Sequence, residues 1–115
     1  MVKRPLKNRA DEQDELVIKA ITSSDRRQIL DILRDEPRTT GAICGELPWL
    51  NRCTVMQHLW VLEKVRLIIT RKAGRQRWNY PDVSPIQHFH ERWIKAYAEP
   101  SASFLSRLRT DLETS

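Results

Sequence analysis

The spacing of apolar residues along this chain changes from helical to alternating near residue 66, and this change limits the folds open to it. Before that point apolar residues recur at helical intervals, which predicts helices packed through one face. After it, residues 67–71 predict a strand, residues 73–75 a turn, and residues 76–80 a returning strand with alternating side chains. We therefore expect a mostly α fold with one small β-hairpin.

Four helices are expected before the hairpin, and three of them follow a residue suited to cap a helix. The first helical stripe begins at Asp14, and Ser23, Thr39 and Asn51 precede the next three helices. Short polar side chains at such positions accept a free backbone N–H. The turn at residues 48–50 then separates a short third helix from a fourth at about residues 51–65. The side chains assigned to the core are Ile29, Leu30, Leu33, Ile43, Leu47, Val55, Leu59 and Leu62.

The C-terminal part predicts two more helices with a long apolar stripe. Ser84 is expected to cap the first of them, with Pro85 at its first position, and Pro100 separates the two. Such a stripe on so small a chain is typical of an interface between copies, although packing onto its own core is the alternative. The predicted homodimer interface is Leu16, Ile86, Phe89, Trp93, Tyr97, Phe104, Leu105, Leu108 and Leu112.

The length of 115 residues allows one hydrophobic core. We expect a flexible arm at residues 1–13 and one domain at residues 14–115, whose dimerisation helices occupy residues 84–113. The beginning of the chain is charged, and no apolar run approaches the ~18 residues of a membrane helix. Two cysteines make no disulfide framework. These features predict a cytoplasmic protein with no membrane partner.

The positive charge of the chain is concentrated in one segment. The formal net charge is +5, and residues 61–80 contain six Lys and Arg but only one acidic residue. A local excess of basic residues is expected of a protein that binds a polyanion. A solvated basic loop is the alternative.

Three segments resemble, in order, motifs of the ArsR-type winged-helix regulators. Residues 19–33 resemble the signature of their second helix, and Thr54–Glu63 (TVMQHLWVLE) resembles their recognition helix, usually written T-V-S-x-H-L-x-V-L. Residues 67–80 resemble their wing, and the tail is similar to the branch with two C-terminal helices. The match covers about residues 15–113. One departure is Val65-Arg66, which replaces a common Ala-Gly before the wing.

The resemblance implies a winged helix-turn-helix fold with about five to six helices and a two-stranded wing. It also implies a dimer, assembled through the first and C-terminal helices, that represses transcription at operator DNA. In this arrangement the second helix of the helix-turn-helix enters the major groove.

The residues expected to contact DNA lie at the start of the fourth helix and on the hairpin. Arg52 is predicted to contact guanine and Gln57 adenine, while the hairpin cations contact phosphates or a minor-groove edge. Trp78 and Tyr80 are expected to anchor the hairpin to the core. Solvated surfaces are the alternative for both regions. The predicted DNA-binding residues are Asn51, Arg52, Cys53, Thr54, Gln57, His58, Arg71, Lys72, Arg75 and Arg77.

We expect no cofactor, no metal and no enzymatic activity. Cys44 lies near a metal-ligand position of the family, but a thiolate site needs several converging ligands. His88 and His90 are two residues apart and point to different sides of a helix. No catalytic motif is present in the sequence. A regulator that responds to metal, or to oxidation of Cys53, stays open as an alternative.

A winged-helix module that binds another protein is the remaining hypothesis. Trp49, Trp60 and Trp93 are the aromatic residues that would anchor such a partner. The charge concentrated in residues 61–80 argues for DNA instead.

Overall fold

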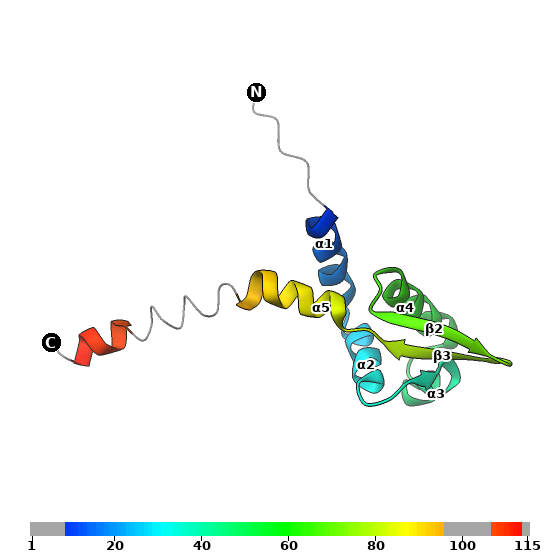
Figure 1. The fold of residues 1–115 in the computed structure, drawn as a ribbon. Helices are drawn as coiled ribbons and strands as arrows, with labels where there is room; N and C mark the ends of the chain where they lie inside the picture. The colour runs from blue at the N-terminus through cyan, green and yellow to red at the C-terminus, as the bar shows by residue number, and fades with distance from the viewer. Residues whose placement is uncertain (1–8, 96–106, 114–115) are drawn as a thin grey trace, which may run out of the picture. The chain divides into compact units, whose positions relative to one another are not determined.

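The computed structural model describes residues 9–95 and 107–113 (Figure 1). The chain divides into two compact units, Met1–Pro85 and Ile86–Ser115. Residues 107–113 are helical. The predicted fold class, mostly α with a small β-hairpin, is confirmed.

The helices and strands before residue 95 follow in the order α1 (Arg9–Ile21), α2 (Ser24–Leu33), β1 (Arg38–Thr39), α3 (Thr40–Glu46), α4 (Arg52–Lys64), β2 (Ile68–Ala73), β3 (Gln76–Pro81) and α5 (Ser84–Phe89), which continues as a π-helical turn (His90–Ile94).

The core of the first unit lies between its helices and one face of its sheet. Every apolar residue assigned to the core from the sequence is buried, except Leu30, which is half-buried. Each fully buried aliphatic side chain of this size contributes roughly 1.5–3 kcal/mol to folding. The buried apolar side chains are Val17, Ala20, Ile29, Leu33, Ile43, Leu47, Val55, Leu59, Leu62, Val65, Leu67 and Ile68.

The three predicted helix caps are confirmed. The side-chain oxygens of Ser23, Thr39 and Asn51 accept backbone N–H groups three residues ahead, at 3.3, 3.1 and 2.8 Å respectively. All three capping residues have extended backbone angles, so the chain turns into each helix at the expected residue. These caps fix where α2, α3 and α4 begin.

Helix α1 begins earlier than the apolar pattern predicted. It starts at Arg9, so residues 9–13, expected to belong to a flexible arm, are helical. Four of these five residues are polar, and all except Asp11 have high helix propensity. A helical turn made mostly of polar residues gives no apolar signal. The side-chain amide of Gln13 also donates to the carbonyl of Val65 at 3.2 Å, which ties this turn to the end of α4. Residues 1–8 of the predicted arm lie outside the described residues.

Helix α4 ends with an arginine in the left-handed region. Arg66 has φ +65°, its N–H donates to the carbonyl of Glu63 at 3.0 Å, and the N–H of Leu67 donates to the carbonyl of Leu62 at 2.9 Å. This pair of hydrogen bonds is the Schellman motif, in which glycine usually occupies the left-handed position. The end of α4 therefore has the geometry expected for the Ala-Gly pair that is common in the family, although Arg66 stands in place of the glycine.

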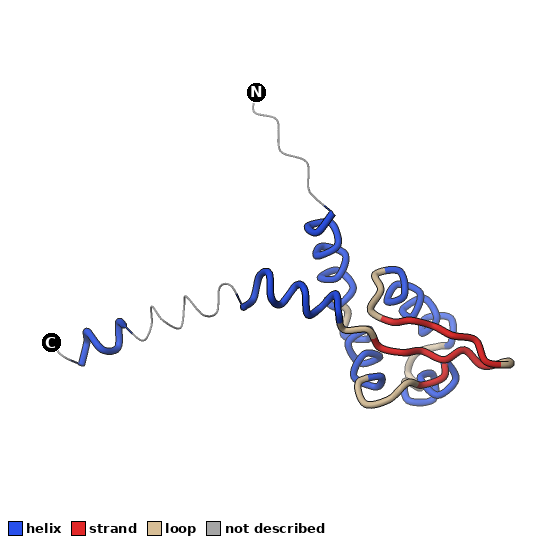
Figure 2. The backbone as a smooth tube through the Cα atoms, viewed as in Figure 1, coloured by secondary structure: helices blue, strands red, loops and turns tan. Residues whose placement is uncertain are grey.

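The sheet has three antiparallel strands in the order β1-β3-β2, and not the two that were predicted. The additional strand, β1, pairs Arg38 with Asn79 and Thr39 with Trp78. Two residues are too few to give an alternating pattern, which is why the sequence did not indicate this strand. β2 and β3 form the predicted hairpin, which extends beyond the helices of its unit (Figure 2).

The expectation that Trp78 and Tyr80 anchor the hairpin to the core is wrong. Asn79, between them, is fully buried, so the two aromatic side chains lie on the opposite face of the sheet. Tyr80 is exposed and Trp78 is half-buried. The Asn79 amide donates to the carbonyl of Arg38 and to the hydroxyl of Thr40, both at 3.2 Å. These two hydrogen bonds offset the cost of burying the amide nitrogen, whereas the amide oxygen Oδ1 is buried without a hydrogen-bond partner among the described residues.

Helix α5 begins at Ser84 itself, whereas this residue was expected to cap it. The carboxylate of Asp82 accepts the backbone N–H of Ser84 at 3.0 Å. Hydrogen bonds from the side chain and the backbone of Ser84 lower the pKa of Asp82. The π-helical turn at His90–Ile94 then interrupts the regular spacing on which the C-terminal apolar stripe was counted. Among the described helices, none is long and apolar enough to cross a membrane.

Candidate nucleic-acid interface

Helix α4 contacts other parts of the first unit on three sides: the core, β2 and α2. Val55, Leu59 and Leu62 face the core and are buried. The side toward β2 carries Glu63, whose carboxylate accepts the hydroxyl of Thr70 at 2.9 Å. The side toward α2 carries His58, which is described below. The start of the helix is exposed at residues 51–53, and the side-chain oxygen of Asn51 caps it.

The side of α4 opposite the core is exposed. Cys53 and Gln57, both predicted to contact DNA, lie there together with Trp60, which is 60% exposed. The ammonium group of Lys64 lies 4.8 Å from the centre of the Trp60 ring. Thr54 is half-buried, nearer the α2 side. This surface therefore offers an amide, a thiol and an indole to a partner.

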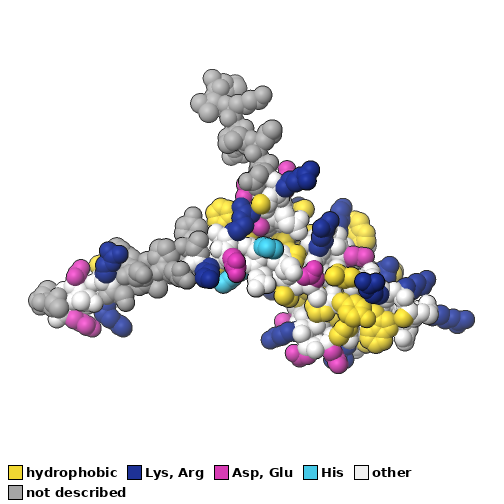
Figure 3. Space-filling model, viewed as in Figure 1, with side chains coloured by type: hydrophobic (Ala, Val, Ile, Leu, Met, Phe, Trp, Pro, Cys, Tyr) yellow, Lys and Arg dark blue, Asp and Glu magenta, His cyan; other side chains and the backbone are white. Residues whose placement is uncertain are grey.

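The hairpin of β2 and β3 carries the predicted wing cations. Lys72 and Arg77 are directly opposite each other in the register and share one face, while Arg71 lies on the other face opposite Trp78. Arg75 follows Gly74, whose φ of +64° makes the turn. All four cations are exposed, and Figure 3 shows Lys and Arg side chains gathered at the end of the hairpin. Like charges directly opposite each other destabilise a strand pair, so the Lys72–Arg77 pair does not contribute to the stability of the hairpin.

A cleft of about 440 Å³ lies between the start of α4, the start of α3 and the hairpin. Arg52 from α4 and three hairpin cations line it together, although they are about 20 residues apart in sequence. None of the described residues that line the cleft is acidic. The sequence did not indicate the contribution of α3 or of Met56. The lining residues are Thr39, Thr40, Gly41, Arg52, Met56, Leu59, Lys72, Arg75, Gln76 and Arg77.

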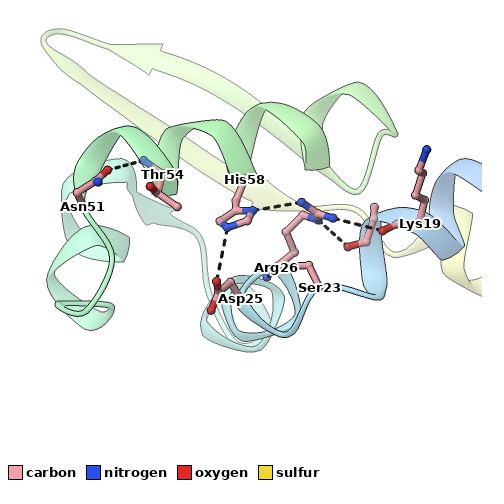
Figure 4. Close-up of polar contacts among 8 residues, drawn as sticks. Lys19, Ser23, Asp25, Arg26, Asn51, Thr54 and His58 are labelled. Atoms are coloured by element: carbon pink, nitrogen blue, oxygen red, sulfur yellow. Dashed lines mark hydrogen bonds and ion pairs between the residues drawn. The ribbon is translucent and has the colours of Figure 1, made fainter.

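His58 is separated from the other predicted DNA-binding residues. It points from α4 toward α2, where its ring lies between the side chains of Asp25 and Arg26 (Figure 4). Its side chain is only 17% exposed. Sequence reasoning missed both partners because they precede His58 by more than 30 residues. The structure thus brings Arg52, Lys72, Arg75 and Arg77 together, and places Arg71 and His58 elsewhere.

The residues predicted for a dimer interface are partly described. Leu16 on α1 is 48% exposed, and Leu108 and Leu112 in the C-terminal helix are 42% and 74% exposed. Ile86 and Phe89 are half-buried, and Trp93 is exposed. Tyr97, Phe104 and Leu105 lie outside the described residues. Leu16 and Leu108 thus expose part of their apolar side chains to solvent.

The two cysteines are free thiols, half-buried at Cys44 and exposed at Cys53. Within residues 9–95 and 107–113, no three His, Cys, Asp or Glu side chains are grouped closely enough to hold a metal ion.

The known proteins to which this chain is similar include transcription regulators. No protein-family model matches the chain. A curated relative, the HTH-type transcriptional regulator Rv2034 of Mycobacterium tuberculosis, is 38% identical over 58 residues, which are 50% of this chain and 53% of the relative. The chain thus matches about half the length of that protein.

Solved structures extend the similarity over most of the chain. A crystal structure of an ArsR family transcriptional regulator has a TM-score of 0.71 and 25% identity, covering 90% of this chain and 98% of that one. The homodimeric winged helix-turn-helix DNA-binding domain Mb0332 of Mycobacterium bovis, solved by NMR, has a TM-score of 0.62 and 23% identity, covering 82% and 90%. The resemblance first noticed in the recognition-helix and wing motifs is thus confirmed, and the chain is similar in fold to the winged helix-turn-helix regulators of the ArsR family.

Proposed function

We propose that this protein is a cytoplasmic transcription regulator that binds double-stranded DNA sequence-specifically as a homodimer and acts as a repressor. The observation that carries the proposal is the cleft between α4 and the hairpin. Four cations line it, none of its described lining residues is acidic, and the exposed side of α4 begins at its edge. Such a surface fits a polyanion that also presents a groove.

When α4 and the hairpin bind DNA together, the cleft between them accommodates one strand of the phosphodiester backbone. In B-DNA a single strand separates the major groove from the adjacent minor groove. With α4 in the major groove and the hairpin at the minor groove, that strand runs between Arg52 and the hairpin cations. Arg52 therefore contributes a phosphate contact rather than the guanine contact suggested by the sequence. Lys72, Arg75 and Arg77 neutralise the same strand.

Base recognition then falls to the exposed side of α4. The amide of Gln57 can both donate to and accept from the edge of adenine. Cys53 and Thr54, one turn earlier, can contact bases or the sugar edge, and Trp60 extends the same side. Phosphate contacts position the protein, and these side chains supply the discrimination.

The homodimer is proposed from the exposed leucines on α1 and in the C-terminal helix. The similar Mycobacterium bovis domain is homodimeric. Two copies with a two-fold axis recognise a pseudo-palindromic site whose half-sites are about one helical turn, ~34 Å, apart. Repression follows if that site overlaps a promoter.

The test is selection of bound duplexes from a random library, followed by affinity measurements over a range of salt concentrations. We expect a pseudo-palindromic consensus, and an affinity that falls with salt by a slope of about 0.9 for each neutralised phosphate. A protein that binds no duplex even at low salt would overturn the proposal. That result would favour the protein-interaction module with Trp49, Trp60 and Trp93 as anchors.

A further inference from the structure

Arg26, at the start of α2, connects three helices through its guanidinium group. Its Nε donates to the carbonyl of Ala20 at 2.7 Å, and one terminal nitrogen donates to the carbonyl of Lys19 at 3.3 Å. Both carbonyls belong to the last turn of α1, where the helix leaves carbonyls without partners of its own. The other terminal nitrogen lies 3.2 Å from Nδ1 of His58, in the middle of α4. Figure 4 shows this arrangement.

The contact with Arg26 determines which nitrogen of the His58 ring accepts a hydrogen bond and which carries the proton. A guanidinium can only donate hydrogen bonds, so Nδ1 of His58 accepts one, and the proton of the neutral ring is on Nε2. Nε2 faces the carboxylate of Asp25 at 3.7 Å. Both ring nitrogens are therefore directed at α2, and neither is available for DNA.

We propose that Arg26 and His58 are positioning residues that hold the recognition helix α4 against the corner between α1 and α2, and that His58 does not contact DNA. This inference rests on the proposed function and deepens it. Together the two side chains form a link from the α1 carbonyls to the middle of α4. Gln13 forms a second link, from α1 to the carbonyl of Val65 at the end of α4. Helix α1 thus fixes α4 at two points along its length.

Positioning of this kind affects base recognition more than phosphate contact. A hydrogen-bonding side chain must lie within about 0.5 Å of its ideal position to discriminate between bases. Long flexible cations on the hairpin tolerate larger displacements and still reach a phosphate. Release of α4 from Arg26 is therefore expected to lower the preference for the selected site while leaving binding to a scrambled duplex almost unchanged.

A double-mutant cycle tests the link. The variants Arg26→Gln, His58→Leu and the double variant are compared for affinity to the selected site and to a scrambled duplex. We expect each single variant to lower the ratio of the two affinities about tenfold, equivalent to ~1.4 kcal/mol. The double variant is expected to lose no more than either single variant, since both break the same link. Additive losses would overturn the proposal, because they would mean that His58 acts on DNA independently of Arg26.

Arg27→Gln is the matched control. Arg27 is adjacent in sequence and also donates to an α1 carbonyl, that of Ile21 at 2.6 Å, but it makes no described contact with α4. We expect this variant to keep the wild-type affinity ratio. His58→Gln, whose side-chain carbonyl can still accept from Arg26, is expected to recover most of the ratio lost in His58→Leu. Failure of this rescue, or an equal loss in Arg27→Gln, contradicts a role specific to the link.

A measurement without DNA separates this inference from the proposed function. The rate of amide hydrogen exchange in α4 is measured in each variant and divided by the rate in β3, which serves as the internal reference. We expect this ratio to be higher in Arg26→Gln than in Arg27→Gln. If the wild-type protein prefers no duplex, the proposed function fails, while faster exchange in α4 still supports the link. Equal exchange in the two variants overturns the link whatever the DNA result.

Discussion

The side-chain amide nitrogen of Asn79 lies 3.2 Å from the hydroxyl oxygen of Thr40, so β3 is hydrogen-bonded to the first residue of α3. Both residues are buried, and Thr40 also lines the cationic cleft. The hairpin and the helix-turn-helix are thus joined directly behind the cleft. Thr40, Arg52 and three hairpin cations line the same cleft.

Asn79→Ala is expected to destabilise the protein by about 1–3 kcal/mol. The substitution leaves the carbonyl of Arg38 and the hydroxyl of Thr40 without the Asn79 amide nitrogen, and it opens a space in the core. Removal of the Oδ1 atom, which is buried without a partner among the described residues, offsets part of this cost. Urea unfolding measures the change. Gln76→Ala, on the same strand but exposed, is the control and is expected to change stability by less than about 0.5 kcal/mol. Equal changes in the free energy of unfolding for the two substitutions would show that the hydrogen bonds of Asn79 do not stabilise the protein.

Arg66→Gly is expected to stabilise the protein by about 0.5–1 kcal/mol. Arg66 has a φ of +65°, and a side chain with Cβ costs about 1–2 kcal/mol in this conformation, part of which is offset by the greater freedom of glycine in the unfolded chain. Thermal or urea unfolding gives the difference. Arg66→Ala removes the charge but keeps Cβ, so it should bring no gain. A gain in both variants would assign the effect to charge instead of backbone conformation.

Arg52→Ala and Gln57→Ala are expected to affect DNA binding in different ways. Loss of Arg52 removes a phosphate contact, so all duplexes bind more weakly and the salt slope falls by about 0.9. Loss of Gln57 removes a base contact, which lowers discrimination at one position by about 1–3 kcal/mol and leaves the salt slope unchanged. Affinities for the selected site and its single-base variants distinguish the two. A loss of discrimination in Arg52→Ala would restore its assignment to guanine.

The stability contributed by Asp82 is expected to depend on pH in the acidic range. Hydrogen bonds from the side chain and backbone of Ser84 lower the pKa of Asp82 in the folded protein. A lowered pKa means that its contribution is fully present above the unfolded pKa and is lost as the pH falls through the folded pKa. The difference in unfolding free energy between wild type and Asp82→Asn should therefore shrink as the pH is lowered below about 4. A difference that grows at acidic pH contradicts this assignment.

Leu108→Asp is expected to convert a dimer to a monomer at micromolar concentration. The substitution places a charge on an exposed apolar side chain that is proposed to meet another copy of the chain. Sedimentation or light scattering gives the mass. Arg109→Asp places the same carboxylate on the adjacent residue, with a larger change in net charge, and should leave the mass unchanged. An unchanged mass in Leu108→Asp would move the interface to another surface.

Features that depend on neighbouring residues were predictable from the sequence. The caps at Ser23, Thr39 and Asn51 each need only a short polar side chain and an N–H three residues ahead. The buried positions of α4 follow from helical spacing alone. The wing cations were identifiable because they are close together in the chain.

Features that depend on distant partners were not predictable. Alternation along β3 established that Trp78 and Tyr80 share a face, but not which face is buried, because Asn79 obtains its partners from residues about 40 positions away. The role of His58 likewise depends on Arg26, 32 residues before it. The cleft is formed by α3, α4 and the hairpin, and only the fold brings these three together.

The position of β2 in the sheet has a consequence for solubility. In the strand order β1-β3-β2, β2 is an edge strand among the described strands, and its outer backbone groups form a template on which another hairpin can add. Arg71 and Lys72 place two positive charges on this strand, and the same charges on a second copy would repel them. Variants that neutralise both cations are therefore expected to precipitate at concentrations where the wild type stays dissolved.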